Sequence, residues 1–455
     1  MELQLKTNVL KGFYKQMVIL GLPIMIQNLV STSLNMVDTI MISSQGEQAL
    51  AAVAIANKFL FIMLVIMFGI NSGTSIFISQ YYGANDHKNI QSVLGMGIIL
   101  GTGVCAVFFG LAFLTPEMVM AVFIKDAKVI ELGSSYLRIV SISYLAMTLT
   151  FAFSNASRCV HRTKVPMIGS IISILLNTFI NYLLIEGHFG FPSLGVEGAA
   201  IATFISRLLE FVILMCFIYL DRTHPLNGKI RELFVFSREL FNKILKTILP
   251  VIINEGLWVV GTSVYYIAYG KLGASSMAAM QISMTLTDLC WAIFTGFGGA
   301  AAVLIGNVIG RGDDKIAFTY AKMTLKAGVL MAILIGILMI AISPFLNVIL
   351  DLSEDTLKLA MSCVVVMSIY LPIRNFNYIM FISVLRSGGD TTYCMIVDAI
   401  TVWVIGVPAT FAAVYFLPIS IPLLIGVSYF EEVVKAVIVY KRFVTKKWIH
   451  VLVTP

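Results

Sequence analysis

Long runs of apolar residues follow one another along the whole chain, and short polar stretches separate them. A helix of about 20 apolar residues crosses the roughly 30 Å hydrocarbon core of a bilayer. The pattern therefore predicts an all-α membrane protein whose principal partner is the lipid bilayer. Its twelve expected transmembrane helices lie near residues 16–43, 50–78, 93–118, 131–156, 164–186, 197–221, 243–270, 275–306, 318–348, 356–384, 392–416 and 419–444.

Composition supports this interpretation, because 59% of the 455 residues are hydrophobic and only 12% are charged. The net charge of +7 could suggest a nucleic-acid partner, but the basic residues alternate by loop. The connection 222–246 is rich in Lys and Arg, whereas SSQGEQ and EGHFGFPSLGVEG have none. By the positive-inside rule, both termini and the even-numbered connections are expected to be cytoplasmic. The charge thus indicates topology in an inner membrane, and no nucleic-acid partner is expected.

The chain is an internal duplication. With an offset of 227 residues, GLPIMIQN pairs with ILPVIINE, so that Pro23 falls on Pro250. With an offset of 228, RCVHRTKVPMI pairs with RSGGDTTYCMI through Arg158 and Arg386. Six helices per half give both halves the same orientation, related by a pseudo-two-fold axis along the membrane normal. The expected parts are an N-lobe at 1–221, a cytoplasmic connecting loop at 222–242 and a C-lobe at 243–455. Paired bundles of this kind favour transport, although a flippase or a membrane enzyme could also use them.

Enzymatic chemistry has no support in the motifs. No G-x-x-x-x-G-K-[ST] or H-E-x-x-H occurs, and the histidines lie in connections or in the tail. GMGIILG, residues 95–101, lies within a predicted membrane helix, where glycines favour close helix packing. We therefore expect no enzyme activity and no cofactor, and any active transport should be coupled to an ion.

Ionisable residues inside a membrane are costly and mark functional sites by default. Glu255 lies nine residues beyond Lys246, which places it about 14 Å deep. Arg374 lies twelve residues before Arg386, which is expected at the cytoplasmic surface, and hence at a similar depth. It is the expected counter-charge for Glu255. The pair is either a fixed structural contact or one that separates during transport and lets Glu255 take a cation.

Four further acids in the C-terminal half lie deep in predicted helices. Asp398 lies about 12 Å into its helix, where it either contacts water near the inner mouth or serves a cation site. Glu432 either pairs simply with Lys435 at i+3 or serves a functional site. Glu431 and Asp288 are candidates for an additional cavity.

The N-terminal half has fewer such groups. Asp38, opposite Tyr265 in the repeat, is either a hydrated carboxylate near a loop or a cation site. Asn177 and Asn181 share a helix face and either line the cavity beside Asp38 or bond neighbouring helices. Arg207 and Glu210 are expected to pair.

The remaining candidates for lining a cavity come from both halves. They are Asn28 (the repeat position of Glu255), Asn254 and Tyr265.

Five segments in order resemble the multidrug and toxic compound extrusion (MATE) family. They are LGLPIMIQNLVSTSLNMVDTIMISSQG, SQYYGANDHKNI, LLNTFINYLLI, LGVEGAAIATFISR and LRSGGDTTYCMI, and the likeness covers essentially the whole chain. The resemblance implies export of cationic, amphipathic compounds in exchange for inward Na⁺ or H⁺.

Carried over residue by residue, the resemblance assigns Asp38 to ion coupling and places Asn177 beside it. The position at which the DinF-like branch has a second aspartate is Asn181 here, so the pattern is closer to the NorM-like branch. That branch has a seventh-helix glutamate, typically eight residues after the proline, whereas Glu255 follows Pro250 by five. Asp390 stands where NorM-like members often have an acid.

The expected function is thus a monomeric, ion-coupled antiporter working by alternating access. Glu255 and Asp398, with Arg374, would form the C-lobe cation site, and Asp38, Asn177 and Asn181 the N-lobe site. Na⁺, if it is the coupling ion, would bind at Glu255 or Asp38. The rival interpretations are a flippase for a lipid-linked oligosaccharide and a non-transporting membrane receptor.

Overall fold

The structure is a computed structural model that describes residues 2–345 and 353–453. These residues form helices and no strands. The longer helices are α1 (Glu2–Ser43), α2 (Glu47–Gly83), α3 (His87–Leu114), α5 (Ala127–Ser141), α6 (Tyr144–Cys159), α7 (Lys164–Leu184), α8 (Gly195–Leu220), α9 (Arg238–Gly270), α10 (Ala274–Gly310), α11 (Asp314–Ile342), α13 (Glu354–Tyr378), α14 (Thr391–Ile400), α15 (Val407–Phe416) and α16 (Ile421–Val444). The short elements are α4 (Pro116–Ala121), η1 (His188–Gly190), η2 (Ile230–Phe234) and η3 (Ser343–Phe345), and the π-helical turns are η4 (Ile379–Leu385) and η5 (Thr401–Gly406).

The helices account for the twelve expected spans. In the described part of the chain, ten continuous helical segments are long and apolar enough to cross a membrane, and the bent pair α5–α6 adds an eleventh. The twelfth is α16, which carries the charges of Glu431, Glu432 and Lys435 in its middle. The expected end of the ninth span, residues 346–348, lies outside the described residues.

Contacts divide the chain into two compact units. The N unit is Ile26–Ile248, and the C unit is Met1–Met25 with Leu249–Pro455. The boundaries therefore fall inside α1 and α9, close to Pro23 and Pro250, where proline removes a helical hydrogen bond. The first part of α1 is grouped with the C-terminal half. The expected lobe limits of 1–221 and 243–455 placed it in the N-lobe instead.

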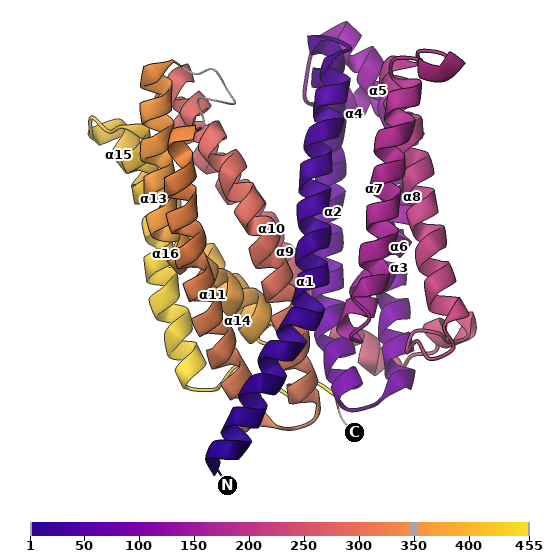
Figure 1. Cartoon of the computed structure of the whole chain (residues 1–455), viewed down its shortest axis with the longest axis vertical. Coiled ribbons are helices and arrows are strands. Elements are labelled where there is room, and N and C mark those ends of the chain that lie inside the picture. Colours follow the sequence, from indigo (N-terminus) through magenta and orange to yellow (C-terminus); the bar gives the residue numbers. More distant parts are fainter. Residues whose placement is uncertain (1, 346–352, 454–455) are drawn as a thin grey trace. The chain divides into compact units, whose positions relative to one another are not determined.

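The N unit packs its helices in neighbouring pairs, with α2 against α3 and α7 against α8 (Figure 1). The glycines within residues 95–101 of α3 let neighbouring elements pack closely against this helix, as the sequence predicts. A Cβ atom on Gly97 would lie 3.1 Å from Thr74 of α2, and one on Gly95 would overlap the Leu233 carbonyl of η2. The segment containing η2, between α8 and α9, is therefore docked on α3.

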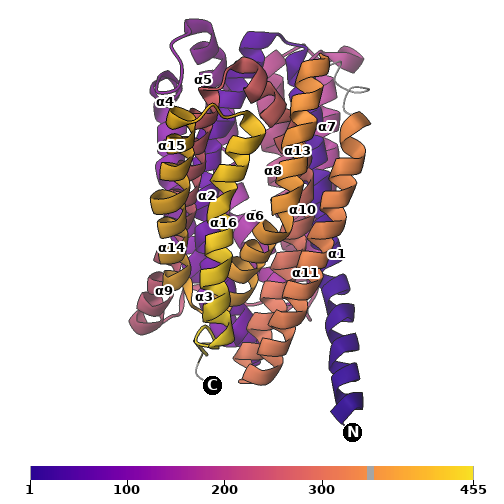
Figure 2. The ribbon, with the colours of Figure 1, turned by 90° about the vertical axis from the view of Figure 1, so that its left-hand side faces the viewer.

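In the C unit α16 runs beside α13, with α14 and α15 on its other side (Figure 2). The buried face of α16 includes Ser428, Glu431, Lys435 and Val439. Their spacing of three and four residues places them on one side of the helix. This face brings two charged side chains into the interior of the unit.

The duplication extends to local backbone geometry. Asp86 and Asp313 occupy matching positions, and each caps the helix that follows by accepting a hydrogen bond from a backbone N–H three residues on. Gly46 and Gly273, which also match, adopt φ values of 98° and 91° at the starts of α2 and α10. Such φ values favour glycine, so the same turn has been retained in both halves.

Candidate functional site

The C unit holds a buried ionic cluster, which consists of Asp398, Glu431, Glu432 and Lys435. The Lys435 Nζ lies 2.7 Å from Asp398, 3.7 Å from Glu432 and 3.8 Å from Glu431. The side chains of Lys435 and Glu431 are only 5% and 7% exposed. The expected pair of Glu432 with Lys435 is confirmed, but Lys435 also contacts two other carboxylates.

Residues of α13 and α14 contribute to the cluster beside those of α16. Asp398 lies in the last turn of α14, shortly before the π-helical turn η5, and π-helical turns frequently occur at functional sites. The amide of Asn377 on α13 donates to the Glu432 carboxylate at 2.6 Å and to its backbone oxygen at 2.7 Å. Glu432 is thus held by a neutral donor as well as by Lys435.

Glu431 has the longest contact with Lys435 and lies beside Tyr265. Both side chains meet next to Gly406, the last residue of η5. A Cβ atom on Gly406 would lie 1.9 Å from the Tyr265 hydroxyl and 2.6 Å from Glu431 Oε2. Glycine is therefore required where the two polar groups meet.

The expected pairing of Glu255 with Arg374 is wrong. Glu255 pairs instead with Arg386, whose Nη2 lies 2.8 Å from Glu255 Oε1, and Arg386 is only 3% exposed. Arg374 donates to the Tyr429 hydroxyl at 3.1 Å, and its guanidinium lies over the Trp291 and Tyr429 rings. Counting depth along straight helices placed Arg386 at the surface, whereas the chain folds it inward after η4.

The N unit has a neutral counterpart of this pair. Arg158 matches Arg386 in the repeat, and its Nη2 donates to Gln27 Oε1 at 2.8 Å. Gln27 aligns with Asn254, the neighbour of Glu255. In each half, therefore, the arginine at the matching repeat position contacts the first helix of that half. The contact is an ion pair in the C-terminal half, whereas in the N-terminal half the acceptor is neutral.

Asp38 lies beside the two asparagines of α7 that were expected near it from the sequence. The Asn181 amide donates to Asp38 Oδ1 at 2.9 Å and to Asn177 Oδ1 at 3.3 Å. Nearby, Arg207 and Glu210 form the predicted pair at 2.9 Å. The structure thus brings Asp38, Asn177 and Asn181 together from α1 and α7.

The other candidates lie in varied surroundings. Asp288 is exposed on α10, whereas Asn254 is buried and Asn28 is half-buried. Asp390 pairs with Arg442 at 2.7 Å. Within the described ranges, no group of three or more His, Cys, Asp or Glu side chains could hold a metal ion.

Sequence reasoning missed the roles of Arg386, Asn377 and Lys435. Arg386 had a signal, because it matches Arg158 in the repeat, but it was interpreted as a loop residue. Lys435 was considered only as the partner of Glu432. Asn377 had no signal in the sequence, because its contact depends on how α13 packs against α16.

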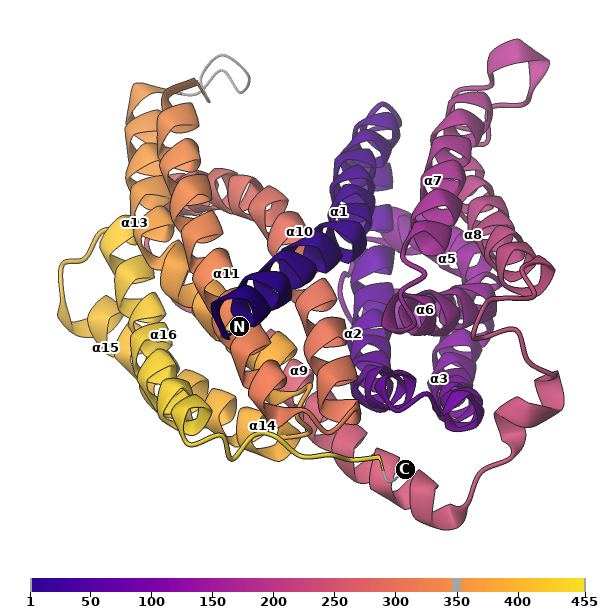
Figure 3. The same ribbon diagram turned by 60° about the horizontal axis from the view of Figure 1, so that its bottom comes forward.

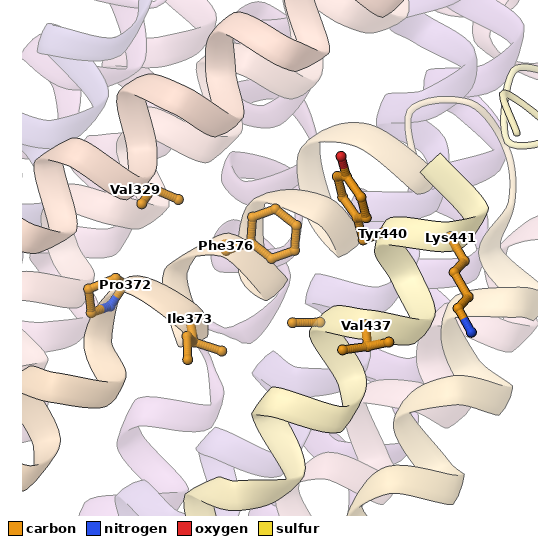
Figure 4. Close-up of a pocket in the computed structure, with 8 residues that line it drawn as sticks. Val329, Pro372, Ile373, Phe376, Val437, Tyr440 and Lys441 are labelled. Atoms are coloured by element: carbon orange, nitrogen blue, oxygen red, sulfur yellow. The ribbon is translucent and has the colours of Figure 1, made fainter. Parts of the chain in front are cut away.

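A hollow of about 450 Å³ lies between α11, α13 and α16 (Figure 4). Its lining is almost entirely apolar and includes Pro372, Phe376 and Val437, with Lys441 also at its edge. None of the acids of the ionic cluster lines it. The hollow is therefore no candidate for binding a coupling cation.

Comparison with known sequences gives matches along nearly the whole chain. A family model described as MatE matches residues 23–183 and 250–412. The "Uncharacterized transporter YisQ" of Bacillus subtilis is 26% identical over 438 residues, covering 94% of this chain and 93% of that protein. The "Probable multidrug resistance protein NorM" of Thermotoga maritima is 23% identical over 416 residues, covering 90% of this chain and 87% of the relative.

Solved structures share the fold. A chain described as MATE in complex with MaL6 superposes with a TM-score of 0.86 at 18% identity, covering 95% of this chain and 97% of the other. A MOP superfamily transporter from Pyrococcus furiosus gives a TM-score of 0.85 at 19% identity, covering 95% and 96%. The family model matches both repeats, and the fold is that of the solved MATE structures. The chain therefore belongs to the MATE family of membrane transporters.

Proposed function

We propose that this transporter exports cationic, amphipathic compounds in exchange for inward H⁺ or Na⁺ by alternating access. Relatives described as probable multidrug resistance proteins support the efflux of drugs. The alternation of basic loops supports an inner-membrane protein with both termini in the cytoplasm. The proposed transporter acts as a monomer and needs no cofactor.

The observation that carries this proposal is the local excess of carboxylates over cations in the ion pairs that Arg386 and Lys435 form in the C unit. Its ion pairs gather four carboxylates, those of Glu255, Asp398, Glu431 and Glu432, around the two cations Arg386 and Lys435. An uncompensated charge is costly in a buried site, so it tends to bind a proton or a cation. Such a site suits coupling to an inward cation and binding of a cationic substrate.

Within the cluster we assign ion exchange to Glu431. Asp398 has a close contact with Lys435, and Glu432 has additional support from Asn377. Glu431 is more buried than either, yet its contact with Lys435 is the longest. Its charge is thus the least compensated, and a proton or Na⁺ would stabilise it most.

Asp38 forms the second proposed coupling site. Its carboxylate faces amide groups of α7, which can bond to it whether it is charged or protonated. Substrate release would follow when a cation neutralises Asp38 or Glu431, because the substrate cation then loses its electrostatic partner.

Flux measurements in proteoliposomes test the proposal. A fluorescent organic cation is followed under an imposed H⁺ or Na⁺ gradient, for the wild type and for Asp38→Asn and Glu431→Gln. Both variants should lose most of the gradient-driven flux. Glu354→Gln is the matched control, since Glu354 is exposed at the start of α13. Wild-type flux that is unaffected by either the H⁺ or the Na⁺ gradient would contradict ion coupling.

A further inference from the structure

Residues 445–453 leave the end of α16 and run past α14, and they contact the loop 387–390 that precedes α14 (Figure 3). We call residues 445–453 the latch. Its anchor is Trp448, which is fully buried. The indole stacks on Phe443 with 6.1 Å between ring centroids, and its N–H donates to the Phe443 carbonyl at 3.3 Å.

The latch fits closely onto two glycines of the loop. A Cβ atom on Gly388 would lie 2.0 Å from the Trp448 carbonyl oxygen. The His450 backbone N–H donates to the Gly388 carbonyl at 3.1 Å, and Leu452 packs against Gly389. Only glycine at 388 leaves room for this contact between backbones.

The loop directly follows Arg386. The Gly389 N–H donates to the Arg386 carbonyl at 2.8 Å, which closes a tight turn. At the other end of the loop, Asp390 Oδ2 accepts from Arg442 Nε at 2.7 Å, and Arg442 belongs to the last turn of α16. The loop is therefore held on one side by the latch and on the other by an ion pair.

The N unit contains an equivalent arrangement with the charges reversed. Arg162 matches Asp390 in the repeat, and it pairs at 3.8 Å with Asp221, which directly follows α8. The segment after Asp221 then docks on α3, where Ser92 donates to the Val235 carbonyl at 2.7 Å. An ion pair and a docked segment thus lie at the end of the sixth span of each half, although the residues differ.

We propose that the latch positions Arg386 against Glu255, with Trp448 and Arg442 as positioning residues. The latch covers the loop, and Arg386 directly precedes the loop. Moving the latch therefore moves the guanidinium relative to the Glu255 carboxylate on α9. This inference goes beyond the proposed antiport, because the positioning can be measured without any transport.

Hydrogen exchange tests whether the latch holds the loop. In purified protein, Trp448→Ala should speed amide exchange in residues 386–394 by about tenfold or more, because local opening becomes easier. Trp448→Phe keeps the stacking on Phe443 and should restore protection. Val451→Ala is the control, since Val451 is an exposed part of the latch. Unchanged amide exchange in Trp448→Ala would overturn the proposal that the latch holds the loop.

A double-mutant cycle tests the positioning of Arg386. Trp448→Ala and Glu255→Ala are compared singly and together by thermal unfolding in detergent. If the latch acts through Arg386, the shift in unfolding temperature of the double variant will be smaller than the sum of the two single shifts. The reason is that the second substitution removes a contact that the first has already weakened. Additive shifts would overturn the positioning role and leave only a packing role for Trp448.

Charge reversal gives a rescue that a packing role does not predict. Asp390→Arg and Arg442→Asp should each speed exchange in the loop, whereas the double variant, which copies the polarity of Arg162 and Asp221, should restore protection. If transport is gradient-driven as proposed, flux should follow the same order. A double variant no better than the single variants would contradict the proposed equivalence of the two halves. Absence of flux in the wild type would overturn the proposed function alone.

Discussion

Arg386 contacts Glu255 in the C unit as Arg158 contacts Gln27 in the N unit, and the donor and acceptor atoms are 2.8 Å apart in both. The two arginines occupy matching repeat positions, but the acceptor is charged in one half and neutral in the other. The contact itself is therefore a feature of the duplicated fold. The charge of the acceptor is specific to the C-terminal half.

This relationship predicts different effects for two substitutions of Glu255. Glu255→Gln should cost about 1 kcal/mol of stability or less, because a neutral amide serves the matching arginine in the N unit. Glu255→Ala should cost about 3 kcal/mol, because it leaves the Arg386 charge buried without this partner. Thermal unfolding in detergent measures both. Equal losses would show that the contact needs no acceptor.

Lys435 should be essential to the stability of the C unit. Lys435→Met removes the cation that Asp398, Glu431 and Glu432 share, and we expect a loss of about 3 kcal/mol or more. Adding Asp398→Asn should recover part of this loss, because it removes the carboxylate nearest to the missing ammonium. Unfolding temperatures of the single and double variants give the comparison. A double variant less stable than Lys435→Met would contradict the electrostatic explanation.

Gly406→Ala should disturb the meeting of Tyr265 and Glu431. The added Cβ atom would overlap the Tyr265 hydroxyl, so we expect lower stability and reduced flux of an organic cation. Adding Tyr265→Phe removes the overlapping oxygen and should restore stability in part. Gly299→Ala is the control, because no neighbouring atom lies within 4 Å of its added Cβ. If Gly299→Ala were equally damaging, loss of glycine alone would explain the effect.

His224, in the docked segment after α8, should make stability depend on pH. Burial, and then the charge of Arg162, lower the pKa of His224 from 6.5 to about 4. Between these values the unfolded chain binds a proton that the folded chain does not, so stability falls as pH decreases. Unfolding temperatures between pH 7 and pH 5 measure the slope.

The matched variant for this measurement is His224→Asn. His224 Nδ1 accepts a hydrogen bond from the Leu226 N–H at 3.1 Å, and an asparagine oxygen can accept the same bond. The variant should show a shallower slope over this pH range, whatever its absolute stability. A slope identical to that of the wild type would contradict the assignment to His224.

The spans and the duplication could be predicted from the sequence because both depend on local features. Apolar length determines which segments can cross a bilayer, and α16 was recognised despite the charges in its middle. The pairs that share one helix face, Arg207 with Glu210 and Glu432 with Lys435, were also predicted, because spacing along a helix determines them.

The partners across helices could not be predicted in the same way. Arg374 and Arg386 were both available to Glu255, and counting depth along straight helices favoured the wrong one. The structure differs because α13 continues into the π-helical turn η4 and the latch covers the loop that follows. These features depend on contacts between residues far apart in the chain, so hydropathy does not reveal them.

The sequence alone determined that the chain spans a membrane, that it is duplicated and that the acids deep in its predicted helices concentrate in its second half. Only the tertiary structure decided which cation each acid contacts. Interior charges are stabilised by partners within about 4 Å, and such distances depend on helix packing and loop conformation. For Glu255 that partner is Arg386, which directly precedes the loop against which Trp448 of the latch is buried.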